Sequence, residues 1–147
     1  MSESSRIMRC KPDDVFAVLS DGWTYGLWVV GAARIREVDP GWPEAGSRIH
    51  HSVGVWPLLI HDTTHSRGAE PPHRLQLRAR AWPTGEADIE FLVEPHDRGC
   101  VVTIREQTAS GPALLIPSFV EGPLLRWRNT ETLRRLAFIA EGRSRSA

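Results

Sequence analysis

The sequence predicts a single α+β domain in which an antiparallel sheet packs against a long C-terminal helix around an apolar pocket. Short segments with strand character fill the middle of the chain, and turn-forming residues separate them at regular intervals. The end of the chain carries apolar residues at helical spacing. The 147 residues suit one ordinary domain, so we expect this domain over residues 1–141 and a polar, disordered tail over residues 142–147.

The N-terminal part predicts a strand followed by a helix. The strand covers residues 5–10, and residues 11–14 then begin the helix. They place a proline in its first turn and carboxylates at the positive end of its dipole. The apolar face of this helix consists of Val15, Phe16, Val18 and Leu19. Residues 20–22 end the helix. Residues 23–28 are too few and too aromatic for an ordinary helix, so we expect a turn or a single helical turn.

The middle of the chain predicts a meander of six antiparallel strands. These strands cover residues 33–38, 47–55, 58–66, 74–82, 87–94 and 101–108. Turn residues occupy positions 39–41, 69–72, 83–85 and 96–99. Apolar and polar side chains alternate along the later strands, which is typical of a sheet with one face in water. The other face is apolar and needs a cover.

The end of the chain supplies that cover. Residues 118–141 predict one long helix with an apolar stripe made by Leu125, Leu133, Leu136, Ala137 and Ala140. The arginines of this helix are expected to face outward: Arg126, Arg128, Arg134 and Arg135.

Composition excludes several classes of function. Eighteen basic and eighteen acidic residues give a formal net charge of zero, so the chain lacks the basic field that nucleic-acid binding needs. No apolar stretch approaches the ~20 residues of a membrane-spanning helix, so we expect no membrane insertion. The N-terminus has no apolar signal segment, and two cysteines are too few for a disulfide framework. We therefore expect a cytoplasmic protein.

The order of the predicted elements resembles the helix-grip fold of the START-like (SRPBCC) superfamily, in particular its bacterial polyketide cyclase/dehydrase branch. The likeness covers essentially the whole chain and depends on the order and spacing of several segments. These are residues 12–21, Trp28 with Val29 and Gly31, residues 46–50, residues 101–106, and Arg128-Asn129 with Leu133 and Leu136.

The resemblance implies a cavity between the C-terminal helix and a curved sheet that wraps around it. Such cavities hold lipid-like, aromatic or polyketide molecules. The superfamily contains binders, transporters and enzymes on one scaffold, so the resemblance carries no reaction and no catalytic residue. It also makes Cys10 and Cys100 members of neighbouring strands, where packing of two reduced thiols is the simplest role. We expect a hydrophobic small-molecule partner and no cofactor, and we leave a homodimer open.

Aromatic residues are the first candidates for the wall of the cavity. Six tryptophans give large contact area with little conformational freedom to lose, although they could equally fill the core. The predicted ligand-binding residues are Trp28, Trp56, Phe91, Ile104, Leu125, Trp127 and Asn129. Asn129 lies near the inward stripe of the last helix, where its amide either meets a ligand oxygen or fixes the helix to the sheet.

Ionisable residues that share the cavity would suit acid-base catalysis. His50 and His51 point to opposite faces of their strand, so one of them should face inward. Glu106 shares its parity with Val102 and Ile104, and it either faces the cavity or pairs with an arginine at the rim. We take His50 and Glu106 as the predicted catalytic pair.

Metal binding is not expected. On a strand that rises ~3.3 Å per residue, His61 and His65 would lie about 13 Å apart, too far to share an ion. The sequence also lacks a nucleophile elbow, a phosphate-binding loop and a dinucleotide fingerprint. The first functional hypothesis is therefore binding of a hydrophobic small molecule, and the alternative is a cyclase or dehydratase that works without a cofactor. An interaction protein is a third interpretation with no specific motif behind it.

Overall fold

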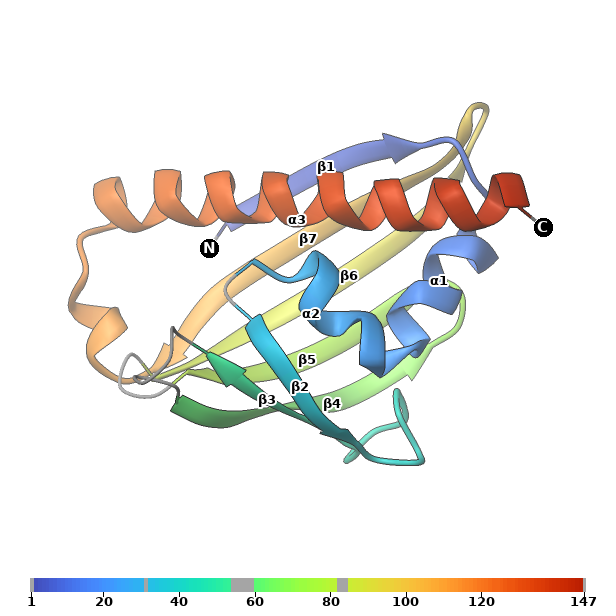
Figure 1. The fold of residues 1–147 in the computed structure, drawn as a ribbon. Coiled ribbons are helices and arrows are strands. Elements are labelled where there is room, and N and C mark those ends of the chain that lie inside the picture. The colour runs from blue at the N-terminus through green and yellow to red at the C-terminus, as the bar shows by residue number, and fades with distance from the viewer. Residues whose placement is uncertain (1, 31, 54–59, 82–84, 147) are drawn as a thin grey trace.

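The computed structural model describes residues 2–30, 32–53, 60–81 and 85–146, and it confirms the α+β helix-grip architecture (Figure 1). The elements in chain order are β1 (Ser2–Met8), α1 (Pro12–Ser20), a 3-10 turn η1 (Gly22–Thr24), α2 (Tyr25–Trp28), β2 (Ala32–Val38), β3 (Arg48–Val53), β4 (Ile60–Glu70), β5 (Arg74–Ala81), β6 (Gly85–His96), β7 (Gly99–Ser110), a 3-10 turn η2 (Pro112–Leu115) and α3 (Ser118–Ser146).

Seven strands form one antiparallel sheet in the order β1-β7-β6-β5-β4-β3-β2. The sheet curls around the helices, and α3 runs along β1 and β7 with α1 and α2 beside it (Figure 1). Every strand from β2 to β6 pairs with the next strand in sequence, as the predicted meander requires. The first strand closes the opposite edge by pairing with β7, from Ser2 opposite Glu106 to Met8 opposite Cys100.

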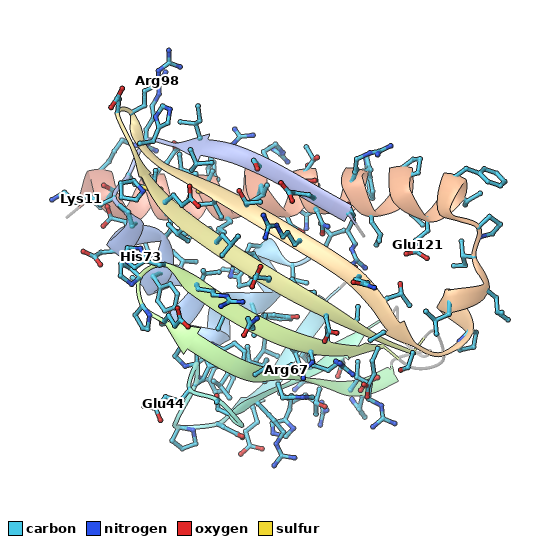
Figure 2. The ribbon with its side chains drawn as sticks, turned by 180° about the vertical axis from the view of Figure 1, so that it is seen from behind. Lys11, Glu44, Arg67, His73, Arg98 and Glu121 are labelled. Atoms are coloured by element: carbon cyan, nitrogen blue, oxygen red, sulfur yellow. The ribbon has the colours of Figure 1, made fainter. Side chains whose placement is uncertain are left out.

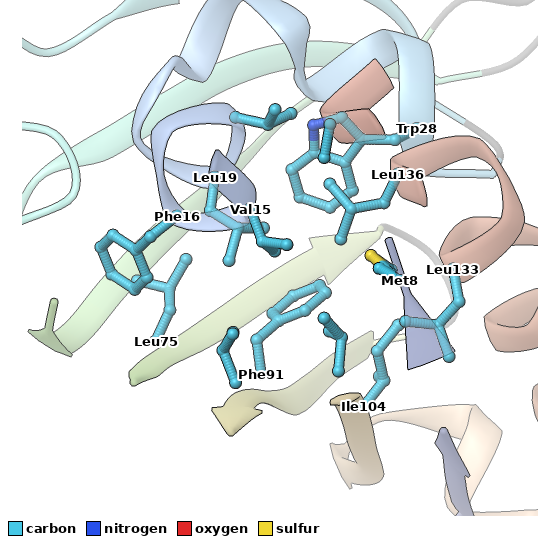
Figure 3. Packing of buried hydrophobic residues seen from close by; sticks show 14 of the residues in the cluster. Met8, Val15, Phe16, Leu19, Trp28, Leu75, Phe91, Ile104, Leu133 and Leu136 are labelled. Atoms are coloured by element: carbon cyan, nitrogen blue, oxygen red, sulfur yellow. The ribbon is translucent and has the colours of Figure 1, made fainter. Parts of the chain in front are cut away.

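The core lies between the inner face of the sheet and the three helices (Figure 3). Phe91 on β6 and Ile104 on β7 meet Leu133 and Leu136 of α3, and α1 contributes Val15 among others. All of these side chains are buried. The alternation along β6 and β7 places Phe91 and Ile104 on the apolar face of the sheet, where the helices cover them. The predicted helical stripe is confirmed, since its five members are all buried.

The outer face of the sheet is polar and carries cross-strand ion pairs (Figure 2). Arg74 on β5 contacts Glu90 on β6 at 2.6 Å, and Arg78 contacts Asp88 at 2.6 Å across the same pair of strands. Opposite charges facing each other across an antiparallel pair stabilise its register. The alternation predicted from the sequence is therefore present on both faces.

The first helix begins as its sequence predicts. Pro12 occupies the first turn, and the Asp14 carboxylate accepts a hydrogen bond of 2.9 Å from the backbone N–H of Lys11. The predicted aromatic turn is also present, as η1 and the single turn of α2.

The C-terminal helix is longer than predicted. It continues through Ser146, so residues 142–146 are helical and the disordered tail expected there is wrong. The Arg143 guanidinium donates to the Asp21 carboxylate at 3.3 Å, and the Ser146 hydroxyl donates to the Gly142 carbonyl at 3.0 Å. Basic residues in the last turn also suit the negative end of the helix dipole.

Several large apolar side chains lie in water where the chain enters α3. They are Leu114, Leu115, Ile116, Phe119, Val120, Leu124 and Trp127. Figure 1 shows the first turns of α3 extending past the start of β1, which leaves this end of the helix without sheet beneath it. A homodimer stays a prediction. Among the described residues, no helix has the length and hydropathy required to cross a lipid bilayer.

Truncating the buried face of α3 should destabilise the fold. Leu136 is fully buried, so Leu136→Ala should lower the free energy of unfolding by about 2–5 kcal/mol through lost burial and a cavity. Phe138 is 77% exposed on the same helix, and Phe138→Ala should change it by less than about 0.5 kcal/mol. Urea unfolding followed by circular dichroism measures both, and equal losses would contradict the packing described here.

Candidate functional site

A cavity of about 160 Å³ lies between the inner face of the sheet, α2 and α3. Aromatic and aliphatic side chains make most of its wall: Tyr25, Trp28, Val29, Leu77, Ala79, Ile89, Phe91 and Ile104. Polar side chains reach it from β3, β4, β5, β7 and α3: His51, Thr64, Arg80, Glu106, Arg128, Asn129 and Thr132. An apolar enclosure with a few polar groups is the usual form of a small-molecule site.

The single turn of α2 presents two aromatic rings to the cavity. Tyr25 and Trp28 are three residues apart and share one face of the helical turn. Their ring centroids are 5.2 Å apart at 66°, and Trp28 meets Phe91 of β6 edge-on at 5.6 Å and 88°. The Trp28 indole N–H donates to the hydroxyl of Thr24 at 3.2 Å, which fixes the ring against the turn. The Trp28 ring is therefore fixed by Thr24 and Tyr25 on one side and by Phe91 of the sheet on the other.

A chain of hydrogen bonds crosses the cavity floor from α2 to β3. The Tyr25 hydroxyl and the Thr64 hydroxyl lie 3.0 Å apart, and Thr64 Oγ1 lies 3.0 Å from His51 Nε2. The Tyr25 and His51 rings also stack, with centroids 5.7 Å apart and an interplanar angle of 20°. All three side chains are buried, so each geometry is fixed by packing as well as by hydrogen bonding.

Two buried polar atoms of the wall have no hydrogen-bond partner among the described residues. They are His51 Nδ1 and Asn129 Nδ2, on side chains that are 4% and 3% exposed. Buried polar atoms in native proteins are nearly always paired, and each exception calls for an explanation. Both residues line the same cavity, whereas the third such atom among the described residues, Ser2 Oγ, does not belong to it.

An ion pair joins α3 to the sheet at the cavity. The Arg128 guanidinium donates to the Glu106 carboxylate, which is only 3% exposed. The sequence left open whether Glu106 faces the cavity or pairs with an arginine. It does both, because Glu106 lines the cavity and its carboxylate binds Arg128. The expectation that Arg128 faces only outward is wrong, because its side chain turns back toward the sheet to compensate this buried charge.

Burial shifts two pKa values in the hydrogen-bonded chain. Loss of hydration raises the pKa of Tyr25 from 10.0 to about 12, against smaller opposing effects of its hydrogen bond to Thr64 and of the Arg128 charge. Burial also lowers the pKa of His51 below its usual 6.5, and the nearby Asp62 charge opposes this only in part. At neutral pH the Tyr25 phenol therefore keeps its proton and the His51 imidazole is uncharged.

The structure brings five of the predicted site residues to the cavity. Trp28, Phe91, Ile104, Glu106 and Asn129 all line it. Their strand parity and helical spacing were sufficient to place them on the inner face.

Three other predicted residues do not line the cavity, and one is not described. His50 lies on the opposite face of β3 from His51, and its Nε2 is 3.3 Å from the Asp39 carboxylate. Trp127 is 65% exposed, and Leu125 is buried without lining the cavity. His50 and Glu106 therefore do not converge. Trp56 lies outside the described residues.

Sequence reasoning missed Tyr25, His51, Thr64 and Arg128. One signal was available for His51, because it shares strand parity with Ile49, which is fully buried. Thr64 and Tyr25 carried no comparable signal, since their role depends on the pairing of β3 with β4 and on the placement of α2.

A larger groove of about 450 Å³ crosses the outer face of the sheet, and its charged side chains are paired with one another. Arg67 contacts Asp88 at 3.1 Å, and Arg105 contacts Glu90 at 3.7 Å. Exposed ion pairs of this kind contribute little and select no ligand. The two cysteines are buried free thiols, and burial raises the pKa of Cys10 to about 12, which makes it unreactive. The cavity on the inner face, which combines an aromatic wall with two unpartnered polar atoms, is therefore the candidate site.

The raised pKa of Tyr25 is directly measurable because it is the only tyrosine in the chain. Absorbance at 295 nm should report one phenolate transition near pH 12 in the folded protein and near pH 10 in urea. The folded state holds the Tyr25 phenol proton more tightly than the unfolded state does, so the free energy of unfolding should be unaffected by this group below pH 10. About 2 kcal/mol should be lost as the pH rises to 12. Tyr25→Phe removes the signal, and a folded-state midpoint at pH 10 would contradict burial of the ring.

Comparisons with known proteins identify the fold. No protein-family model and no curated protein matches the sequence. The di-domain ARO/CYC StfQ from the steffimycin biosynthetic pathway matches with a TM-score of 0.72 and 15% identity, over 96% of this chain and 50% of StfQ. Ara h 8.0201 matches at 0.70 and 12% over 94% and 95% of the two chains. Protein CV1439 from Chromobacterium violaceum matches at 0.68 and 16% over 95% and 96%.

These identities are low, and the likeness concerns the backbone. StfQ contains two domains, and this chain corresponds in length to about half of it. The match to complete single-domain chains covers nearly every residue on both sides. The chain therefore has the helix-grip fold, which it shares with the di-domain ARO/CYC proteins StfQ and BexL.

Proposed function

We propose that this protein binds a small, largely apolar molecule in the cavity between the sheet, α2 and α3. The observation that carries the proposal is an aromatic enclosure that contains two buried, unpartnered polar atoms, on His51 and Asn129. A protein stabilised only by packing would gain from filling this space with apolar side chains. A ligand with polar atoms would satisfy both groups and fill the volume.

The volume indicates how large the ligand is. A protein cavity of about 150 Å³ with an apolar lining is large enough to hold benzene. The present cavity of about 160 Å³ therefore suits one aromatic ring, or one ring of a longer molecule. Trp28 and Phe91 stand at right angles, so they offer both a face and an edge to a flat ligand. Single-ring compounds are the appropriate first probes.

Filling the cavity should abolish binding without unfolding the protein. Ala79 lines the cavity from β5, and Ala79→Leu should weaken binding of a single-ring probe such as ethylbenzene at least tenfold. Gln76→Leu adds an apolar side chain on the outer face of the same strand and should leave the dissociation constant unchanged. Isothermal titration measures both, and circular dichroism checks the fold. Undiminished binding by Ala79→Leu would place the ligand elsewhere.

Proton-transfer catalysis of the cyclase or dehydratase type is the second candidate function. A carboxylate and an imidazole, Glu106 and His51, line the same cavity and could move protons in an enclosed site. The similarity in fold to ARO/CYC domains supports this candidate as an analogy only. His51 replaces His50 in the predicted pair, because His51 is the histidine of β3 that lies on the inner face.

A simple exchange reaction tests this second function. If Glu106 accepts a proton from bound substrate, the protein should accelerate exchange of the α-hydrogens of acetophenone in D2O, and Glu106→Gln should not. Proton NMR follows the loss of the methyl signal. His50→Gln is the matched control, since it changes a histidine of the same strand that faces away from the cavity. Exchange at the buffer rate with the wild-type protein would remove the catalytic candidate and leave the binding function standing.

A further inference from the structure

The hydrogen atoms of the Tyr25–Thr64–His51 chain can be assigned from the contacts that each group has. The Tyr25 hydroxyl has one partner among the described residues, Thr64 Oγ1 at 3.0 Å. If Thr64 donated to Tyr25, the phenol hydrogen would be buried without an acceptor. The arrangement that pairs every hydroxyl hydrogen has Tyr25 donating to Thr64, and Thr64 donating onward to His51 Nε2.

This direction fixes the tautomer of His51. Since Nε2 accepts from Thr64 and a neutral imidazole has one N–H, the hydrogen of His51 lies on Nδ1. That nitrogen is one of the two unpartnered atoms of the cavity. The other is the amide nitrogen of Asn129, which carries two hydrogens. Both unpartnered groups are therefore donors, and the cavity lacks an acceptor for them.

The charge balance of the cavity determines what kind of acceptor suits it. Both arginines of the wall already have carboxylate partners: Arg128 binds Glu106, and Arg80 lies 3.6 Å from Asp62. The imidazole of His51 is uncharged in its buried position. A carboxylate ligand would therefore enter without a free positive charge to offset its lost hydration. The suitable acceptor is a neutral oxygen.

We infer that the cavity selects a neutral carbonyl compound, whose oxygen accepts hydrogen bonds from His51 Nδ1 and Asn129 Nδ2 while its apolar part packs against Trp28 and Phe91. This inference rests on the proposed binding function and adds the chemical class of the ligand. A carbonyl oxygen accepts hydrogen bonds through two lone pairs and brings no hydrogen of its own. A hydroxyl group would bring a hydrogen that His51 Nδ1 cannot accept, because this nitrogen carries a hydrogen of its own in the assigned tautomer.

Four single-ring probes of similar size distinguish the chemistries. Acetophenone offers a neutral acceptor, ethylbenzene offers none, 1-phenylethanol adds a donor, and benzoate adds a negative charge. Acetophenone should bind wild-type protein at least tenfold tighter than each of the other three by isothermal titration. The carbonyl carbon of ¹³C-labelled acetophenone should also move downfield on binding, because hydrogen bonds to the oxygen polarise the bond.

Variants locate the preference in the two donors. Asn129→Leu and His51→Phe keep similar volume and remove one donor each, so each should reduce the preference for acetophenone over ethylbenzene by at least threefold. His50→Phe changes the neighbouring histidine outside the cavity and should leave the preference unchanged. Thermal unfolding checks each variant, and the wild-type probe comparison stands if a variant does not fold.

The outcomes separate this inference from the proposed function. Equal binding of ethylbenzene and acetophenone would overturn carbonyl selection and leave apolar binding intact. If 1-phenylethanol bound more tightly than acetophenone, the assigned direction of the hydrogen bonds would be wrong, and with it the carbonyl class. If benzoate bound more tightly than acetophenone, the inference that the ligand is neutral would be wrong. Binding of none of the four would overturn both proposals. The expected order, together with the ¹³C shift, is the result that establishes the carbonyl class.

Discussion

The apolar inner face of a seven-stranded sheet is the constraint on which the rest of this structure depends. One helix is too narrow to cover such a sheet, and α3 packs chiefly along β1 and β7 at one side. Curling of the sheet and the short elements α1 and α2 cover the remainder (Figure 1). The cavity lies on the inner face, where α2, α3 and the sheet meet. Its position therefore follows from the geometry of covering a curved sheet with helices of limited width.

Polar residues in this cavity lower the stability of the fold, so their presence calls for an explanation. Glu106 and Arg128 compensate each other, yet a buried ion pair rarely stabilises a protein more than an apolar pair of similar volume. The Tyr25–Thr64–His51 chain is internally paired, but it ends in a nitrogen without a partner. Such groups lower stability unless something else pairs with them. The simplest physical reason to place them in this wall is recognition of a ligand.

Much of the fold could be predicted from the sequence, because alternation and helical spacing depend on local burial. Residues 87–94 show this, since Phe91 and Val93 are buried on the inner face of β6 as expected. The end of α3 could not be predicted in the same way. Its last turn is polar. A hydrogen bond from Arg143 to the carboxylate of Asp21, a residue 122 positions earlier in the chain, holds it in place. Contacts of that sequence separation leave no periodic pattern.

The candidate site was predictable only where it follows the same periodicities. Phe91, Ile104 and Glu106 were found by strand parity, and Asn129 by its position on the helix. The choice between His50 and His51 required the register of β3, because a shift of one residue exchanges the two faces. Trp127 is exposed instead of lining the cavity, because this part of α3 carries a second apolar face that lies in water.

The buried chain of hydrogen bonds also favours binding over turnover. Burial keeps Tyr25 protonated and His51 uncharged by the same mechanism, since both charged forms would lose hydration. A base whose protonated form is disfavoured takes a proton weakly, and Glu106, the other candidate base, is already engaged by Arg128. His51 and Asn129 can donate hydrogen bonds to a neutral oxygen without any change of charge. Catalysis would require one of them to become charged or to leave its partner, so the arrangement is better suited to holding a ligand than to transforming it.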